Sequence, residues 1–241
     1  MTNPSPVPDL RSLLQPTAFG VAGEAALDAA CRVARIEQFK VPTLLSAAGE
    51  QPVYLRLEVK GHIEVIARNS SDAEFVVGYI TTGGWATWLA CFMAQPPEND
   101  FYCSASSTLV ALPIADVRAL CERFPQIYPA IIRQIGRRMR LLIEWTGQSV
   151  LVGPVQRMAK LLHILAREQQ VESGSIKLNV SQARLAGLAR CSRQTANELI
   201  GVLEKKGLLV SGYSSVEIPE LTRLAAFADA VGADTLAMHQ I

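Results

Sequence analysis

The stretch from Val180 to Leu209, VSQARLAGLARCSRQTANELIGVLEKKGLL, constrains the fold more than any other part of the sequence. It contains two short helical patterns separated by a break at Arg190 and Cys191. Ser192 follows the break where a helix N-cap belongs, because its hydroxyl can accept a backbone N–H of the first turn. The second pattern repeats apolar residues at helical spacing, and these must face a core: Ala196, Leu199, Ile200 and Leu203.

The opposite face of the second helix carries long hydrogen-bond donors near its N-terminus, namely Arg193, Gln194 and Asn197. In the major groove of DNA, arginine matches guanine bidentately, whereas glutamine and asparagine match adenine. We therefore expect a helix-turn-helix whose second helix reads DNA. In the first helix, Gln182 and Arg184 are expected to face outward. The alternative is a helical hairpin whose exposed face is only solvated.

Short β-type runs flank the two helices, at 176–178 before them and at 208–210 and 216–218 after them. A polar segment at 211–215 separates the last two runs and is typical of a turn. A strand, two helices and a hairpin together form a winged helix. The flanks therefore favour the DNA-binding interpretation over the plain hairpin.

The part of the chain from Ile36 to Pro113 consists of short apolar runs separated by proline and glycine. This spacing predicts an antiparallel all-β unit, a β-roll or jelly roll. Within it, the alternation in residues 53–59 predicts a strand with one wet face. With the helical patterns before and after the roll, the expected fold class is α+β.

A long helical pattern starts after Pro125 and continues to about Val152. Its apolar positions alternate by four and three, as in a coiled-coil seam, and predict a dimer interface: Tyr128, Ile132, Ile135, Met139 and Leu142. Gly153 and Pro154 interrupt the pattern and suit the start of another helix. The expected domains are an N-terminal arm (1–25), a β-roll effector or sensor domain (26–124), a dimerisation helix (125–152), a winged helix-turn-helix domain (153–220) and a C-terminal helical tail (221–241).

The 241 residues allow two modest domains, and the net charge of +1 is unevenly distributed. Residues 1–124 hold 9 Lys and Arg against 13 Asp and Glu, whereas residues 125–241 hold 14 against 9. The basic second half is therefore the better candidate for a DNA surface. No apolar run reaches the roughly 18 residues of a membrane span, and the first ten residues lack the order of a signal peptide. We expect a cytoplasmic protein without a membrane partner.

The five cysteines are scattered, without C-x-x-C spacing or a partner histidine at zinc spacing. No metal site is therefore expected. We expect reduced core residues in a reducing compartment at Cys31, Cys91, Cys103, Cys121 and Cys191. Redox sensing by Cys91 and Cys103 is the alternative.

The order of β-roll, long dimer helix, hinge and winged helix resembles the CRP/FNR family, that of the cyclic-AMP receptor protein and FNR. The resemblance covers about residues 30–220 and is strongest in RRM (137–139), RMAKLLHILA (157–166) and CSRQTANELIGVLEKKGLL (191–209). It implies a homodimeric transcription regulator that binds double-stranded DNA at a near-palindromic operator, because its recognition helices enter successive major grooves. It also implies RNA polymerase as a partner.

The resemblance assigns roles to the helix-turn-helix residue by residue. The family's base-reading arginine falls on Arg193, and Gln194 stands where the family usually has glutamate. Hydroxyls or amides that touch phosphate are implied at Ser192, Thr195 and Gln182. With Asn197 and Arg190, these residues form the predicted DNA-binding set.

Two positions depart from the family pattern. Glu198 stands where the best-known member has a second base-contacting arginine, so the half-site sequence cannot be carried over. Arg190 replaces the usual turn glycine, which implies a strained or reshaped turn and an additional phosphate contact.

The effector site departs further. GGWATWLACF (83–92) aligns with the family's phosphate-binding cassette, and no Arg or Lys occurs from Asn69 to Val117. A buried phosphate without a cationic partner is strongly disfavoured, so we predict that the chain does not bind cyclic AMP. Four apolar residues are expected either to line an apolar pocket for another small-molecule effector or simply to fill the roll, leaving no effector: Trp85, Trp88, Phe92 and Leu142.

No cofactor is expected. An FNR-type iron–sulfur cluster needs several cysteines near the N-terminus, and only Cys31 lies there. His62 is the only histidine of the predicted roll, and a lone strand histidine is typical of a solvated or hydrogen-bonded residue rather than of a haem ligand.

Two other functions remain open. The first is an enzyme built on the β-roll, like metal-dependent cupins, but such a site needs several histidines and a carboxylate close together. His62, His163 and His239 are far apart in sequence, and no catalytic motif is present, so we predict that the chain is not an enzyme. The second is a family member that dimerises without binding DNA, for which Glu198 is the warning sign.

Overall fold

The structure is a computed structural model that describes residues 9–68, 74–93, 95–148, 152–169, 171–212 and 214–230. The chain divides into two compact units, Met1–Gln134 and Ile135–Ile241. Helix α6 (Ile127–Gln148) begins in the first unit and ends in the second. None of the helices in the described ranges has the length and apolar character that crossing a bilayer requires.

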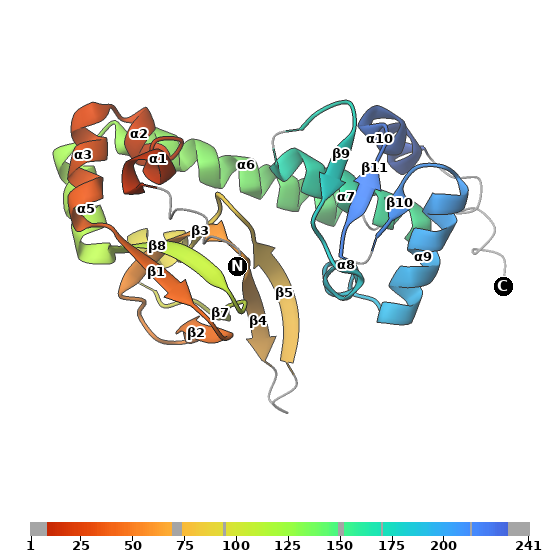
Figure 1. The fold of residues 1–241 in the computed structure, drawn as a ribbon, viewed down its shortest axis with the longest axis horizontal. Helices are drawn as coiled ribbons and strands as arrows, with labels where there is room; N and C mark the ends of the chain where they lie inside the picture. Colours follow the sequence, from red (N-terminus) through yellow and green to blue (C-terminus); the bar gives the residue numbers. More distant parts are fainter. Residues whose placement is uncertain are drawn as a thin grey trace, which may run out of the picture. The chain divides into compact units, whose positions relative to one another are not determined.

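The first unit contains two four-stranded antiparallel sheets, with strand orders β1-β8-β3-β6 and β2-β7-β4-β5 (Figure 1). The strands are β1 (Arg35–Phe39), β2 (Thr43–Ser46), β3 (Tyr54–Lys60), β4 (Ile63–Arg68), β5 (Glu74–Ile80), β6 (Trp85–Ala86), β7 (Asp100–Cys103) and β8 (Ser107–Pro113). The predicted roll of antiparallel strands is therefore confirmed. The structure adds β6 and β7, whose sequences do not form long apolar runs.

The register of the first sheet shows which side chains lie inside the roll. Leu109 of β8 stands opposite both Glu37 of β1 and Glu58 of β3, so these three share one face. Leu109 also packs with Ile63 and Cys103 of the second sheet. Glu58 consequently points between the sheets and is fully buried. The prediction of a wet face in residues 53–59 is wrong at this position, because the second sheet covers that face.

Helices cover the outer side of the first sheet. They are α1 (Leu10–Leu14), α2 (Ala18–Val21), α3 (Glu24–Val33), α4 (Trp88–Phe92) and α5 (Ile114–Arg123) (Figure 1). Thr17 caps α2 by accepting the backbone N–H of Phe19 at 3.3 Å. Leu14, Phe19 and Leu27 are fully buried. Part of the predicted N-terminal arm therefore belongs to the core of this unit.

The second unit is a winged helix. Its elements are α7 (Pro154–Glu168), β9 (Ile176–Leu178), α8 (Gln182–Ala189), α9 (Arg193–Lys205), β10 (Val210–Ser211), β11 (Val216–Ile218) and α10 (Leu221–Asp229). The three strands form one antiparallel sheet in the order β10-β11-β9. The predicted strand at 208–210 begins later than expected, because Leu208 and Leu209 are buried in the core of the unit before the strand starts.

The first and last helices of the winged helix, α7 and α10, each have a specific stabilising feature. Pro154 occupies the first turn of α7 after the N-cap Gly153, where a missing N–H costs nothing. Helix α10 contacts α7, and the buried Nζ of Lys160 donates to Oδ1 of Asp229 at 2.8 Å. The predicted amphipathic tail is therefore a packed helix up to Asp229, and residues 231–241 lie outside the described ranges.

Candidate nucleic-acid interface

Helix α9 begins with a side-chain cap. Ser192 Oγ accepts the backbone N–H of Thr195 at 3.0 Å, which confirms the predicted N-cap. The hydroxyl groups of Ser192 and Thr195 also share a hydrogen bond of 2.8 Å. Because each hydroxyl carries one proton, this bond uses one of them and leaves the other to donate outward, as a phosphate contact requires.

One face of α9 is buried and the other is exposed. Ala196, Ile200 and Leu203 are at most 2% exposed and belong to the core of the winged helix. The side chains predicted to read bases lie on the exposed face: Arg193, Gln194 and Asn197. The helix therefore presents forked donors to solvent from a rigid support.

The exposed face also carries an acidic side chain. Glu198 lies one turn after Gln194, and Gln194 Nε2 donates to Glu198 Oε1 at 3.2 Å. The second carboxylate near this surface is Glu204, which accepts the backbone N–H of Ser211 at 2.9 Å and the hydroxyl of the same residue. Glu204 therefore fixes the first strand of the wing, whereas Glu198 contacts a predicted base-reading side chain.

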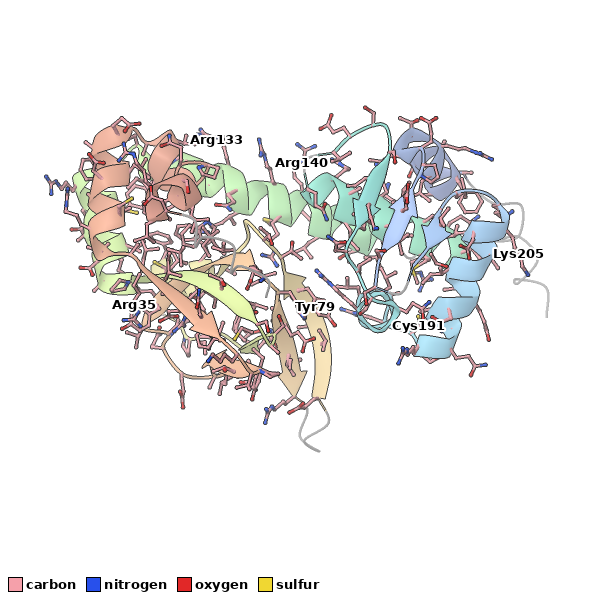
Figure 2. The ribbon with its side chains drawn as sticks, viewed as in Figure 1. Arg35, Tyr79, Arg133, Arg140, Cys191 and Lys205 are labelled. Carbon is pink, nitrogen blue, oxygen red and sulfur yellow. The ribbon has the colours of Figure 1, made fainter. Side chains whose placement is uncertain are left out.

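The turn between α8 and α9 has the strain that its sequence predicts. Arg190 adopts the left-handed conformation, with φ 52° and ψ 47°, and its side chain is exposed. A residue with a Cβ adopts this conformation at a cost of roughly 1–2 kcal/mol. Cys191 follows, and burial raises the pKa of its thiol, an effect that the nearby Arg157 opposes. Figure 2 labels Cys191 before the start of α9 and Lys205 at its end.

Helix α8 differs in one respect from the prediction. Ser181 caps it by accepting the backbone N–H of Arg184 at 3.2 Å, and Gln182 is half-buried at its start. Arg184 was expected to face outward, but only 8% of it is exposed. The eight-residue helix buries Arg184 together with Leu185 and Ala186, and the methylene chain of an arginine can cover apolar surface.

The predicted seam on α6 is mostly exposed in a single chain. The exposed fractions are 38% for Tyr128, 67% for Ile132, 60% for Met139 and 59% for Leu142, whereas Ile135 is half-buried. Ile143 adds another exposed apolar side chain at 61%. Arg133 and Arg140 also project from α6 (Figure 2). Large apolar side chains at these positions leave a helix face without cover in the monomer.

Three of the four predicted effector-pocket residues contact one another in the first unit. The ring centroids of Trp85 and Trp88 are 5.2 Å apart, and those of Trp88 and Phe92 are 5.7 Å apart in a stacked arrangement. The row continues to Phe19 at one end and to Tyr128 at the other. Leu142 belongs to the second compact unit.

The two tryptophans are closely surrounded. Trp85 is 3% exposed and Trp88 is 7% exposed, and neither indole N–H has an acceptor among the described residues. A cavity of about 350 Å³ in the same unit is lined by other residues, among them His62, Glu64 and Tyr102. The aromatic side chains of the cassette therefore pack against one another and occupy the space around it.

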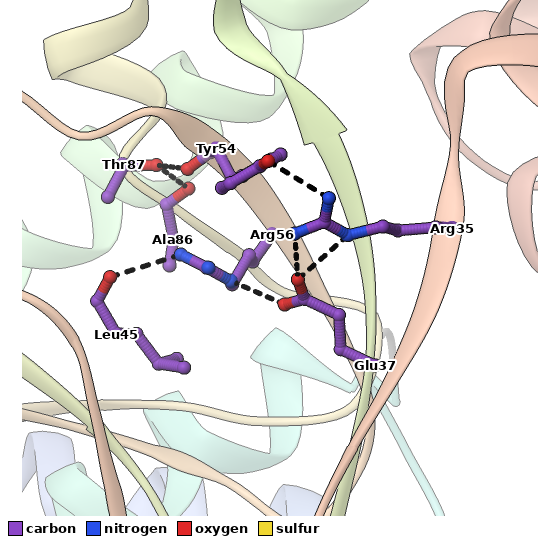
Figure 3. A network of polar contacts seen from close by, with 7 residues as sticks. All are labelled: Arg35, Glu37, Leu45, Tyr54, Arg56, Ala86 and Thr87. Atoms are coloured by element: carbon purple, nitrogen blue, oxygen red, sulfur yellow. Dashed lines mark hydrogen bonds and ion pairs between the residues drawn. The ribbon is translucent and has the colours of Figure 1, made fainter.

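Sequence reasoning missed a charged network inside the roll. Arg56 donates from Nε to Glu37 Oε2 at 2.8 Å and from Nη1 to the carbonyl oxygen of Leu45 at 3.1 Å, while Arg35 contacts Glu37 and the hydroxyl of Tyr54 (Figure 3). Burial alone would raise the pKa of Glu37, but the hydrogen bonds from Arg56 and Arg35 outweigh it and hold the pKa below its ordinary value. The signal in the sequence was the alternation in residues 53–59, whose polar face was taken for a solvated one.

Glu58 is a further residue whose environment the sequence did not reveal. It is 0% exposed, and in the described part of the chain neither carboxylate oxygen has a hydrogen-bond partner within ordinary distance. Burial raises its pKa to about 8, and the backbone amide of Lys60 opposes this only weakly. A carboxyl in such surroundings is stable only in its protonated form.

These observations define a class of protein: a β-roll unit followed along the chain by a winged helix whose helix α9 has an exposed polar face. Residues 156–227 match the Crp-like helix-turn-helix domain family. The cAMP-activated global transcriptional regulator CRP of Salmonella typhimurium is 21% identical over 177 residues, which cover 72% of this chain and 84% of that protein. The CRP-like protein Clp of Xanthomonas euvesicatoria is 26% identical over 163 residues, which cover 63% of this chain and 69% of Clp. Residues 156–227 of the chain therefore form a helix-turn-helix domain of the Crp-like family, and the rest of the chain is similar to proteins that carry this domain.

Solved structures share this fold. The c-di-GMP-responsive global regulator CLP of Xanthomonas campestris has a TM-score of 0.62 at 21% identity and covers 81% of this chain and 99% of its own. FixK2 of Bradyrhizobium japonicum has a TM-score of 0.66 at 15% identity, with 83% and 100% covered. The sequence relatives are transcription regulators rather than enzymes, and this chain carries their helix-turn-helix domain.

Proposed function

We propose that the protein is a homodimeric transcription regulator that binds a near-palindromic operator in double-stranded DNA through α9. The observation that carries the proposal is the arrangement of α9, which buries one face in the winged-helix core and exposes Arg193, Gln194 and Asn197 on the other. Forked donors on an exposed, rigidly supported helix fit the edges of bases in the major groove. Because the operator lies in genomic DNA, the protein acts in the cytoplasm, and RNA polymerase is a further partner.

Each residue of the interface has a role in this proposal. Arg193 reads guanine, and Gln194 and Asn197 read adenine. The remaining side chains contact phosphates and set the register of the helix on the duplex: Gln182, Arg190, Ser192 and Thr195. The free hydroxyl proton of the Ser192–Thr195 pair and the exposed guanidinium of Arg190 support these assignments.

In this proposal each domain has a separate role. Residues 26–124 are the sensor, residues 125–152 the dimerisation helix and residues 153–220 the DNA-binding domain, flanked by the segments 1–25 and 221–241. The exposed seam of α6 supports association with a second copy, because burying each large apolar side chain contributes about 1.5–3 kcal/mol. Two recognition helices related by a two-fold axis then meet two half-sites of one operator.

We also propose that the sensor does not bind cyclic AMP and answers to another small molecule, or to none. Arg56 lies inside the roll, but Glu37 and the carbonyl of Leu45 already occupy its guanidinium. A cyclic phosphate would have to break that ion pair and would leave the half-buried carboxylate of Glu37 with Arg35 as its remaining cationic partner, and breaking a buried ion pair is costly. Calorimetric titration with cyclic AMP is expected to give no binding at micromolar concentrations.

The test of DNA binding uses duplexes selected from genomic fragments and fluorescence anisotropy. Affinity is expected to fall steeply between about 50 and 200 mM salt, because phosphate contacts release counterions. Arg193→Ala should cost about 1–3 kcal/mol and relax the preference at one base pair per half-site. Arg223→Ala removes an exposed cation from α10 and serves as the control that keeps the sequence preference. An Arg193→Ala variant that selects the same bases as the parent contradicts the assignment.

The test of the dimer uses light scattering. Met139→Glu places a charge in the seam and is expected to yield monomers, whereas Arg137→Glu changes charge on the opposite side of the same helix and should leave the dimer intact. An unchanged mass for Met139→Glu refutes the seam. A parent protein that dimerises but binds no duplex at any salt concentration supports the alternative of a family member without DNA binding.

A further inference from the structure

The exposed face of α9 contains a side-chain pair at i and i+4, namely Gln194 and Glu198. Residues at this spacing are neighbours on a helix surface, and Gln194 Nε2 donates to Glu198 Oε1 at 3.2 Å. In the part of the chain that the structure describes, Glu198 forms no ion pair with Lys or Arg. The contact of its carboxylate is therefore the carboxamide of Gln194.

An acidic side chain on this surface needs a physical reason, because the phosphates of DNA repel it. A carboxylate is a strong acceptor, and its hydrogen bonds are stronger than those between neutral groups. Glu198 can hold one N–H of the Gln194 amide and so distinguish the two orientations of that amide, which otherwise differ little in shape. The hydrogen bond between Gln194 and Glu198 offsets the repulsion between the carboxylate and the phosphates.

We propose that Glu198 is a positioning residue that fixes the carboxamide of Gln194 for adenine. The proposal rests on the proposed function, in which α9 lies in the major groove.

The chemistry follows from the donors that remain. A glutamine amide has two N–H donors and one carbonyl acceptor. With one N–H held by Glu198, Gln194 offers one donor and one acceptor side by side. Adenine presents the complementary pair, the N7 acceptor and the N6 amino donor. Guanine presents two acceptors, N7 and O6, and the held amide has only one N–H left for them.

The proposal distinguishes positioning from direct reading. If Glu198 read a base itself, it would accept from the amino group of cytosine, and its removal would alter a base position other than that of Gln194. If it positions Gln194, the two residues govern the same position. Removing either one then affects one and the same adenine.

The experiment selects bound duplexes from a pool with a randomised half-site, using the full chain. The parent is expected to select adenine at one position, which Gln194→Ala abolishes. Glu198→Ala should lower the adenine preference at that same position about tenfold, which corresponds to one net hydrogen bond. Glu198→Gln keeps an acceptor and should retain more of the preference than Glu198→Ala. The guanine selected by Arg193 should persist in all three variants.

A second measurement removes a single atom from the DNA. Replacing the selected adenine by 7-deazaadenine deletes the N7 acceptor and should weaken the parent about tenfold and the Glu198→Ala variant much less. Glu217→Ala deletes an exposed carboxylate from β11 of the same unit, so it controls for the change in net charge and should leave the base preference intact. Equal thermal melting of the variants shows that the fold is unchanged.

Three results decide the matter. An adenine preference that survives Glu198→Ala overturns the proposal. A change at a different base position in that variant also overturns it, because Glu198 would then read DNA directly. A parent that selects no sequence at all overturns the proposed function, and this proposal with it.

Discussion

The buried carboxyl of Glu58 leads to a prediction about stability and pH. Glu58→Gln replaces it with an amide of the same shape that cannot ionise. The wild-type carboxyl lies between the two sheets, near the Cys103 thiol, and its oxygens lack hydrogen-bond partners within ordinary distance among the residues that the structure describes. Only its protonated form suits these surroundings, and burial raises its pKa to about 8. The amide mimics this protonated form at every pH.

The sign and size of the effect follow from linkage. A carboxyl whose folded pKa is raised binds more protons in the folded state, so stability is full below the unfolded pKa of about 4.5 and falls as the pH rises toward about 8. One pKa unit corresponds to about 1.4 kcal/mol, so the parent loses about 3 kcal/mol between pH 4.5 and pH 7. We expect Glu58→Gln to match the parent near pH 4.5 and to exceed its stability by about that amount at pH 7.

Urea unfolding at several pH values measures this difference. Tryptophan fluorescence reports on the roll, because Trp85 and Trp88 are buried there. Glu37→Gln is the matched control with the opposite sign, since the pKa of Glu37 is lowered and its removal should destabilise the protein more as the pH rises. Parallel stability curves for the parent and Glu58→Gln between pH 5 and pH 8 refute the reasoning.

Two further predictions concern backbone strain and the N-terminal helices. Arg190→Gly should raise the stability of the winged helix by about 1 kcal/mol, because glycine adopts the left-handed conformation without a Cβ penalty, while DNA affinity falls through loss of a cation; a lower melting temperature contradicts the strain. Phe19→Ala should cost about 3–5 kcal/mol and change the fluorescence of Trp85, whose ring centroid lies 5.9 Å away; the neighbouring exposed Val21→Ala is the control, and equal melting of both variants contradicts a core role for Phe19.

The winged helix was largely predictable because its signals are local. The cap at Ser192, the apolar spacing of Ala196, Ile200 and Leu203, and the turn at Arg190 each depend on residues a few positions apart. The structure confirms all three. Arg184 was misjudged because a short helix can bury a wide arc, and a long side chain can lie along it.

The interior of the roll was not predictable from the same kind of signal. An alternating strand indicates that its two faces differ, but not which of them another sheet covers. Glu37, Arg56 and Glu58 come from strands that are adjacent only through β8, and their environment depends on a second sheet far along the chain. Long-range pairing of this kind leaves no mark on the spacing of nearby residues.

The aromatic row constrains how any effector can act on the roll. Each ring of the row contacts the next one, in the order Phe19, Trp85, Trp88, Phe92 and Tyr128. These ring contacts connect the cassette to α2 and to the start of α6. Each aromatic pair contributes about 0.5–1.5 kcal/mol beyond its buried area. A ligand that separates the two tryptophans must first replace these contacts, and its binding would displace the side chain of Tyr128 in the proposed dimer seam. An apolar effector would therefore be coupled to α6 through ring packing, whereas a ligand that leaves the fluorescence of both tryptophans unchanged binds elsewhere.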